Sequence, residues 1–245
     1  MDVNRRRELE DEFWRTSPEE RPESDSLENV VNKAQDAAVL LGLLRLYENV
    51  FREARSILEI GAGQGWAACM VKRMFPSAVV TATDLSSAAV ASAWKWERVF
   101  DVKLDHVRHC PSDDLQEPDS SIDVVFCFAA AHHFVTHRGT LEEIHRVLRP
   151  GGHGLYLYEP TCPDYLYDAA LRRVERKRPA VPEDVIRHAH LRSLAEAVGL
   201  ECEVQFYPSV ARRGPVETLY YAFLSRLPFL QPHVPCTANF VFRKR

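Results

Sequence analysis

The chain has 245 residues, of which 46% are hydrophobic and 27% charged, and its formal net charge is −4. These values are typical of a globular domain and argue against a nucleic acid or an anionic membrane as partner of the whole surface. The six cysteines include no CxxC pair, which excludes the usual zinc and disulfide-scaffold patterns. Because the N-terminus lacks the apolar core of a signal peptide and no apolar run could span a bilayer, we expect a cytoplasmic protein without membrane association.

The first 50 residues predict an arm and a helix that lie outside the main domain. Residues 1–28 are rich in acids and hold two adjacent aromatic residues, Phe13 and Trp14. Apolar residues then recur at helical spacing, which predicts an amphipathic helix over about 26–51. An arm with so little apolar sequence has few reasons to be ordered alone. We therefore expect residues 1–50 to act as a lid whose aromatic pair packs over a bound ligand.

From residue 51 onward, short apolar runs alternate with helical stretches. The sequence predicts strands over 56–60, 78–84, 103–109, 122–129 and 154–159, and helices over about 64–75, 86–99, 138–148 and 183–198. Apolar strands separated by helices are typical of a parallel sheet covered on both faces, so the predicted fold class is α/β. Two further strands, near 201–210 and 238–245, predict an edge hairpin interrupted by an insert at 211–236.

A glycine-rich turn follows the first of these strands. The segment EIGAGQGW, residues 59–66, ends a strand and begins a helix, so it presents backbone N–H groups at a helix N-terminus. Asp84 ends the next strand, where a carboxylate can accept hydrogen bonds from both hydroxyls of a ribose. A dinucleotide site would show GxGxxG, whereas here the third glycine comes one residue early. The pattern predicts a site for a nucleoside-containing cofactor, with a nicotinamide dinucleotide as the alternative.

These motifs resemble those of the class I S-adenosylmethionine-dependent methyltransferases. The resemblance rests on EIGAGQGW followed by Asp84, on DSSIDVVFCFAAAHHF at 119–134 and on EEIHRVLRPGGHGLYLYE at 142–159. It covers residues 50–160 closely and 183–245 loosely. It implies a Rossmann-like, seven-stranded, mainly parallel sheet with an antiparallel last strand and helices on both faces. The methyltransferase domain would span 51–245, with an insert at about 161–183, and its cofactor would be S-adenosylmethionine.

The resemblance also implies which residues hold the cofactor. Asp84 would hold the ribose, Leu85 would pack beside the adenine, and Glu59 would order the glycine turn. Ser112 or Asp113 would serve near the adenine, because Pro111 stands where the family commonly has an acid. The complete set implied for the cofactor is Glu59, Gly61, Ala62, Gly63, Gly65, Trp66, Asp84, Leu85, Ser112, Asp113, Phe128 and Ala129.

The ends of the fourth and fifth strands hold three candidates for catalysis. His132 and His133 follow the fourth strand, and a neutral imidazole can accept the proton of a hydroxyl group. We predict His133, then His132, as the general base, with a purely structural part in the loop as the alternative. Glu159 ends the fifth strand and is expected to face the same cleft as a substrate anchor or rival base. No set of carboxylates suits an octahedral ion, so no metal is predicted.

Together these features predict an S-adenosylmethionine-dependent methyltransferase that acts on a small molecule, with O-methylation of a sugar or specialised metabolite as the first expectation. The sequence allows a homodimer. The alternatives are methylation of a macromolecule, either protein or RNA, and a nicotinamide-binding oxidoreductase. Family members that methylate nucleic-acid amines carry a [DNS]PP[YFW] run after the fourth strand, whereas this chain carries FAAAHHF there. The negative net charge also argues against a nucleic acid as partner.

Overall fold

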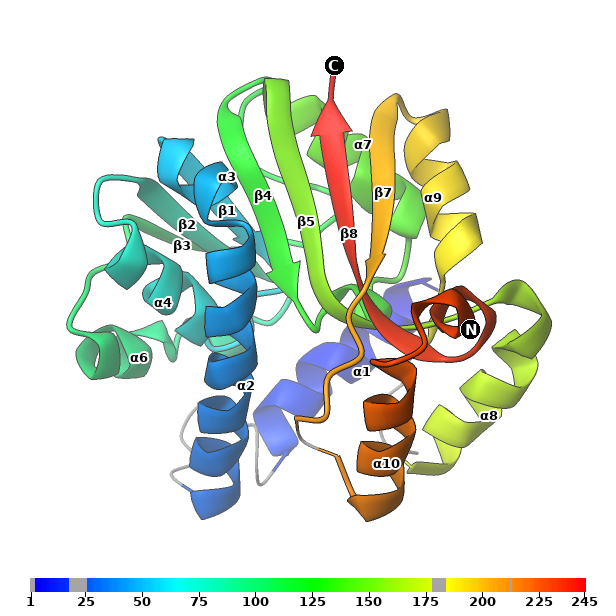
Figure 1. Cartoon of the computed structure of the whole chain (residues 1–245). Coiled ribbons are helices and arrows are strands. Elements are labelled where there is room, and N and C mark those ends of the chain that lie inside the picture. Colours follow the sequence, from blue (N-terminus) through cyan, green and yellow to red (C-terminus); the bar gives the residue numbers. More distant parts are fainter. Residues whose placement is uncertain (1–2, 18–25, 178–183, 212) are drawn as a thin grey trace.

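The computed structural model describes residues 3–17, 26–177, 184–211 and 213–245, and a single mixed β-sheet forms its centre (Figure 1). The strands lie in the order β3-β2-β1-β4-β5-β8-β7, with β6 beside β5. Their bounds are β1 (Ser56–Ile60), β2 (Val79–Asp84), β3 (His106–His109), β4 (Ile122–Phe128), β5 (Leu148–Cys162), β6 (Ile186–Arg187), β7 (Leu200–Phe206) and β8 (Cys236–Lys244).

The direction of the strands agrees with the predicted sheet. Neighbours from β3 to β5 run parallel, and β8 runs antiparallel to both β5 and β7. One detail differs from the prediction: the described sheet has eight strands rather than seven, because Ile186 and Arg187 pair with the end of β5. As predicted, the last two long strands pair at the edge of the sheet, with β7 outermost and β8 between β7 and β5.

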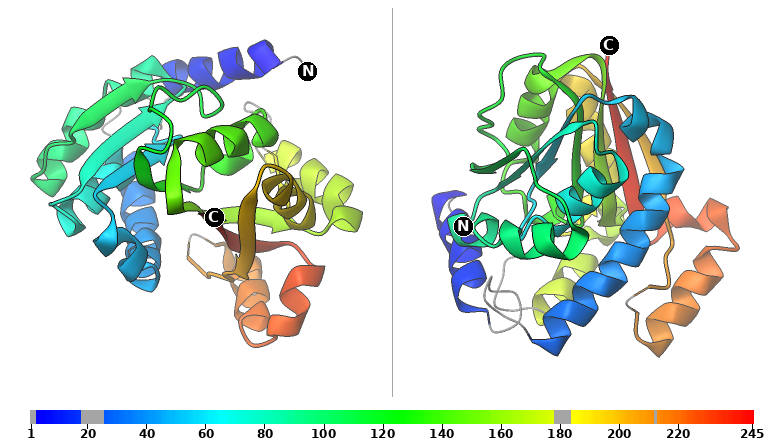
Figure 2. Two further views of the ribbon diagram at one scale, coloured as in Figure 1. Left: turned by 90° about the horizontal axis from the view of Figure 1, so that it is seen from above. Right: turned by 90° about the vertical axis from the view of Figure 1, so that its left-hand side faces the viewer.

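Helices cover both faces of the sheet (Figures 1 and 2). One apolar core joins the sheet to α2, α3 and α4, and a second core joins the opposite face to α7 and α9. Along β5, Leu155 and Leu157 belong to the first core and Tyr156 to the second, as the alternation of side chains in a strand requires. The helix bounds are α1 (Val3–Thr16), α2 (Leu27–Leu46), α3 (Glu48–Glu53), α4 (Trp66–Met74), α5 (Ser87–Val90), α6 (Ala93–Phe100), α7 (His137–Val147), α8 (Tyr167–Lys177), α9 (His188–Ala197) and α10 (Pro215–Leu224).

Several helices end or begin elsewhere than predicted. The helix expected over 26–51 is interrupted at Tyr47, which separates α2 from α3. The helix expected over 86–99 is divided into α5 and α6, and α9 begins only at His188 because the two residues before it join the sheet. The insert at 161–183 contains α8, and its residues 178–183 lie outside the described part of the chain. The insert at 211–236 contains α10.

The parallel strands all end along one side of the sheet. Helices that take no part in the two apolar cores lie on this side. The helices α1, α8 and α10 and the first half of α2 lie beyond the carboxyl ends of β4 and β5 (Figure 1). In open α/β sheets, ligands bind at this side, where the loops that follow neighbouring strands converge.

Candidate active site

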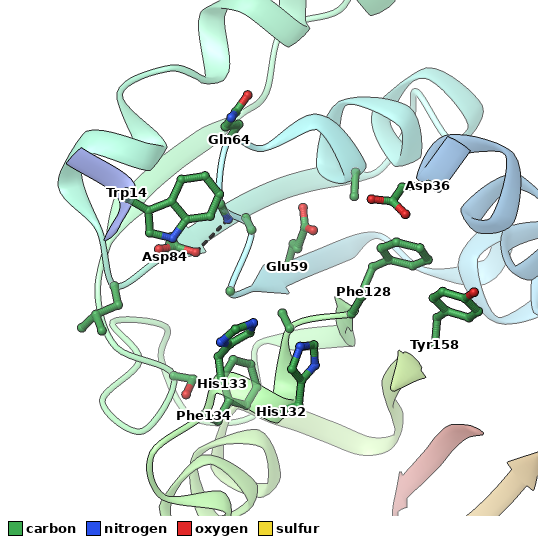
Figure 3. Close-up of a pocket in the computed structure, with 18 of the residues that line it drawn as sticks. Trp14, Asp36, Glu59, Gln64, Asp84, Phe128, His132, His133, Phe134 and Tyr158 are labelled. Atoms are coloured by element: carbon green, nitrogen blue, oxygen red, sulfur yellow. Dashed lines mark hydrogen bonds between the residues drawn. The ribbon is translucent and has the colours of Figure 1, made fainter. Parts of the chain in front are cut away.

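A pocket of about 800 Å³ lies at the carboxyl ends of the parallel strands (Figure 3). Most of the residues that the sequence singled out line it, namely Glu59, Gly61, Ala62, Gly63, Trp66, Asp84, Leu85, Ser112, Asp113, Phe128, Ala129, His132 and His133. The fold therefore brings together residues from the loops after four strands. Gly65 and Glu159 do not line the pocket.

The glycine turn and the end of β2 are tied together by hydrogen bonds. Asp84 is 7% exposed, and its carboxylate accepts the backbone N–H of Gly63 at 2.7 Å and that of Ser86 at 2.8 Å. The backbone N–H of Ala62 also bonds the carbonyl of Thr83 at 2.9 Å. Two backbone donors thus fix the plane of the Asp84 carboxylate at the rim of the pocket.

The three glycines of the turn have different reasons to be glycine. All adopt positive φ, which favours residues without a Cβ. A Cβ on Gly61 would lie 2.9 Å from the Phe134 ring, and one on Gly63 would lie 2.9 Å from the Trp14 ring. A Cβ on Gly65 would instead lie 3.2 Å from the Cβ of Ala93, so Gly65 serves the packing of α4 against α6 and not the pocket wall.

Glu59 is a buried acid at the base of the pocket. It is 2% exposed, and its Oε2 has no hydrogen-bond partner among the described residues. Burial, together with the nearby charge of Asp84, raises the pKa of Glu59 well above its ordinary value. A buried carboxyl oxygen without a hydrogen-bond partner lowers the stability of the fold. A cationic ligand group in the pocket would supply the missing partner.

The loop after β3 also lines the pocket and is held by side chains from distant parts of the chain. The hydroxyl groups of Ser112 and Thr140 are 2.9 Å apart. Asp113 accepts Nη2 of Arg7 at 2.6 and 2.7 Å and also the hydroxyl of Thr136. Asp113 thus anchors two other segments at the place where the family resemblance implies an adenine contact.

The loop after β4 is organised by Glu159. This carboxylate is fully buried and accepts the backbone N–H groups of Ala130 and Ala131 at 2.9 Å and that of His132 at 3.2 Å. It also lies 2.8 Å from Nδ1 of His132. Burial alone would raise the pKa of Glu159, but the hydrogen bonds from His132 and the loop outweigh burial and hold that pKa below its ordinary value. An ionised carboxylate can accept Nδ1–H of His132, and in that tautomer of the neutral imidazole Nε2 carries no proton.

This geometry corrects the expectation for Glu159, which does not face the cleft and cannot anchor a substrate. The reason is a β-bulge. Between Tyr156 and Glu159 the register of β5 against β8 shifts by one residue, and Tyr158 adopts a φ of 62°. Simple alternation would place Glu159 on the face of Leu157; the bulge turns it to the opposite face, towards the His132 loop, and turns Tyr158 into the first core.

Aromatic side chains form one wall of the pocket beside the two histidines (Figure 3). The rings of Phe128 and Tyr158 stack with centroids 5.8 Å apart, and Trp66 meets Phe128 edge-on at 5.5 Å. The His132 and His133 rings lie 4.2 Å apart. Acidic Asp36 reaches the same part of the pocket from α2.

Other lining residues have no signal in a local motif. They come from α1, α2, the segment after β7 and the start of β8, and include Arg7, Phe13, Trp14, Lys33, Asp36, Arg213 and Thr237. The sequence suggested only the aromatic pair of α1 as ligand contacts. In the described part of the chain, no group of three or more His, Cys, Asp or Glu side chains is arranged to hold a metal ion, and no helix is long and apolar enough to cross a membrane.

The sheet order, the glycine turn after β1 and the acid that ends β2 define the class I, Rossmann-like methyltransferase fold. Comparison with known sequences agrees, because the profile of a family described as "Methyltransferase domain" matches residues 58–156. A fatty-acid O-methyltransferase of Mycolicibacterium smegmatis is 28% identical over 178 residues, which cover 69% of this chain and 62% of that protein. A phthiotriol/phenolphthiotriol dimycocerosates methyltransferase of Mycobacterium tuberculosis is 35% identical over 102 residues, which cover 42% of this chain and 37% of that protein. The chain thus spans less than two thirds of the length of these relatives.

Solved structures show the same fold. The geranyl diphosphate C-methyltransferase of Streptomyces coelicolor, determined with S-adenosylhomocysteine, covers all of this chain and is itself fully covered, with a TM-score of 0.72 at 10% identity. The YcgJ protein of Bacillus subtilis gives a TM-score of 0.63 at 19% identity, covering 85% of this chain and 99% of that one. The profile match over residues 58–156 and the shared fold support a class I S-adenosylmethionine-dependent methyltransferase domain in this chain.

Proposed function

We propose that the protein transfers a methyl group from S-adenosylmethionine to an oxygen atom of a small metabolite. The observation that carries the proposal is the pairing of two walls in one pocket. One wall holds Asp84 and Glu59 for a nucleoside that bears a cationic amino acid, and the other holds the imidazole of His132, whose Nδ1 lies 2.8 Å from Glu159.

The residues present fit the cofactor. The unpartnered Oε2 of Glu59 suits the ammonium group of the methionine part, and Asp84 suits the two hydroxyls of the ribose. Gly61 and Gly63 allow the Phe134 and Trp14 rings to pack closely against the turn, where a Cβ would meet each ring at 2.9 Å. Bound there, the cofactor supplies a methyl group on a sulfonium with a good leaving group.

The protein's own share is to position the acceptor and to remove its proton. In our proposal, Nε2 of His132 takes the proton of the acceptor hydroxyl, and Glu159 holds the ring in place through Nδ1–H and steadies the imidazolium that forms. This reverses the order of the two histidines expected from sequence, because Glu159 bonds His132. The stacked Phe128 and Tyr158 rings limit access of water to the acceptor. The mechanism requires no metal ion.

The names of relatives support an oxygen acceptor. Two of them are named as O-methyltransferases, one of fatty acids and one of malonyl-[acyl-carrier protein]. The pocket combines aromatic walls with charged groups from α2 and the segment after β7, as Asp36 and Arg213 illustrate. We propose a specialised metabolite with a hydroxyl or carboxyl group as the substrate class; a sugar is the second choice, since the relatives named act on acyl compounds.

The test is methyl transfer to a panel of hydroxylated and acyl metabolites, with formation of S-adenosylhomocysteine as readout. His132→Ala should lower turnover by about 10²–10⁴-fold, the usual worth of a positioned base, with cofactor affinity nearly unchanged. His106→Ala is the matched control, because that imidazole is exposed on β3 and outside the pocket. Wild-type turnover in His132→Ala would contradict the assignment of the base. Failure of the wild-type protein to bind S-adenosylhomocysteine would contradict the function.

A further inference from the structure

The helix α1 crosses the loops after three neighbouring strands in their order in the sheet. Arg7 contacts Asp113 after β3, Asp11 bonds Ser86 after β2 at 2.8 Å, and the Trp14 ring lies against Gly63 after β1. Positions 7, 11 and 14 share one face of a helix. Seven residues rise about 10 Å, which matches two strand spacings of about 4.8 Å. The length and the face of α1 are therefore matched to this side of the sheet.

The same three loops carry the residues to which the cofactor is assigned. Asp113 stands at the adenine end, Asp84 at the ribose and Gly63 at the methionine end, and each lines the pocket. Arg7 and Trp14 of α1 also line it. A nucleoside ligand that lies along the three loops is thus covered by α1 over its whole length.

Two polar contacts hold the helix in this position. Arg7 places a single Nη2 between both oxygens of Asp113, with the two side chains 30% and 16% exposed. Asp11 bonds the hydroxyl of Ser86, a residue that is fully buried and whose own N–H bonds Asp84. The second contact therefore links α1 through one residue to the carboxylate assigned to the ribose.

We infer that α1 is a latched roof of the cofactor site, closed by the Arg7–Asp113 and Asp11–Ser86 contacts, and that it must lift to let the cofactor in and its demethylated product out. The inference rests on the proposed cofactor site. It assigns a function in cofactor exchange to Arg7 and Asp11, neither of which belongs to a methyltransferase motif in this sequence.

The two possible roles of Arg7, as a latch of α1 or as a simple ligand contact, predict different rate constants for binding and release of the ligand. If Arg7 only contributed affinity, Arg7→Ala would speed dissociation and leave association unchanged. If α1 must open, cutting a latch raises the population of the open form and speeds both steps. We expect association and dissociation of S-adenosylhomocysteine each to become about five- to tenfold faster in Arg7→Ala and in Asp11→Ala. This is the size expected for loss of one partly buried, charge-assisted contact.

The experiment is stopped-flow mixing of the full chain with S-adenosylhomocysteine, followed by tryptophan fluorescence, since Trp14 and Trp66 both line the pocket. Arg5→Ala is the matched control: it removes an exposed pair with Glu8 on the same helix and should leave both rate constants unchanged. Arg7→Lys keeps the charge and should fall between wild type and Arg7→Ala. Hydrogen exchange of α1 amides gives a second readout; S-adenosylhomocysteine should slow it in wild type and less so in Arg7→Ala.

The outcomes separate the two proposals. If wild type binds S-adenosylhomocysteine but both rate constants in Arg7→Ala and Asp11→Ala stay within twofold of wild type, the latch is wrong and the methyltransferase assignment stands. Faster dissociation with unchanged association also overturns the latch, since it shows a contact and not a gate. If wild type binds no S-adenosylhomocysteine, the proposed function itself is wrong.

Discussion

Replacing Glu59 by Gln should stabilise the fold and weaken cofactor binding at the same time. Glu59 is 2% exposed, and its Oε2 has no partner among the described residues. Burial raises its pKa in the folded protein well above the ordinary value of 4.5. A buried, ionised Glu59 therefore lowers the free energy of unfolding, whereas the neutral amide of Gln would not. The same unpaired charge is what favours binding of a cation.

The pH dependence of stability follows from the direction of this pKa shift. A group whose pKa is higher in the folded than in the unfolded state binds more protons when folded, so stability falls as pH rises through that interval. Gln carries no titrating proton. The melting temperature of Glu59→Gln should therefore exceed that of wild type by a margin that widens as pH rises from the ordinary pKa of a Glu towards the raised pKa of Glu59 in the folded protein, with each kcal/mol worth about 2–4 °C in a chain of this size.

Binding should change in the opposite direction. Loss of a buried, charge-assisted hydrogen bond to the ammonium group costs about 1.5–3 kcal/mol, or about 10- to 150-fold in affinity for S-adenosylhomocysteine. Because the ammonium group favours ionised Glu59, binding to wild type should tighten as pH rises towards the raised pKa of Glu59 in the folded protein, whereas binding to Glu59→Gln should not show this trend.

Calorimetry of S-adenosylhomocysteine binding and thermal melts, each at two pH values, check the expected change in affinity and the expected change in melting temperature. Glu53→Gln, at an exposed position on α3, is the matched control and should change neither property. Unchanged affinity in Glu59→Gln, or a difference in melting temperature that does not vary with pH, would refute the reasoning about the unpartnered carboxyl oxygen.

Two further predictions concern the neighbouring acids. Asp84→Ala should weaken binding of S-adenosylhomocysteine by about 1.5–3 kcal/mol through loss of charge-assisted hydrogen bonds, and an unaltered calorimetric affinity would remove Asp84 from the ribose site. Glu159→Gln should lower the free energy of unfolding by about 3–5 kcal/mol at neutral pH, because it removes the charge from a buried network. Since the pKa of Glu159 is depressed in the folded protein, wild type loses this advantage as pH falls through that pKa. Denaturant titrations should therefore show the two proteins converging in acid, and a constant difference would argue against an ionised Glu159.

The sequence was most informative where the signal is local. The strands that precede Gly61, Asp84 and His132 are apolar runs bounded by turn residues, and the glycine turn is a contiguous motif. These features were enough to predict the parallel sheet and most residues of the pocket wall.

What could not be predicted depends on long-range contacts or on a single backbone angle. Arg7 and Asp113 are 106 residues apart, and no local pattern links them. Glu159 was expected to face the cleft, but the bulge with Tyr158 at positive φ reverses the alternation of side chains in β5. A Tyr residue rarely adopts a left-handed conformation, so its presence does not predict one. The order of the two histidines followed from the same bulge, since it brings Glu159 to His132.

The position of β8 inside the sheet has a consequence for biosynthesis. Thr161 at the end of β5 and Cys236 at the start of β8 pair although they are 75 residues apart, and among the strands of the described residues β7 pairs with β8 alone. During synthesis, the edge of β5 that pairs with β8 therefore has no hydrogen-bond partner along most of its length until β8 has been made. The strand β7 lacks its partner for the same time. An unpaired apolar edge is prone to aggregate. Closure of this half of the sheet is expected to be the slow step of folding and the stage at which a chaperone would be of most use.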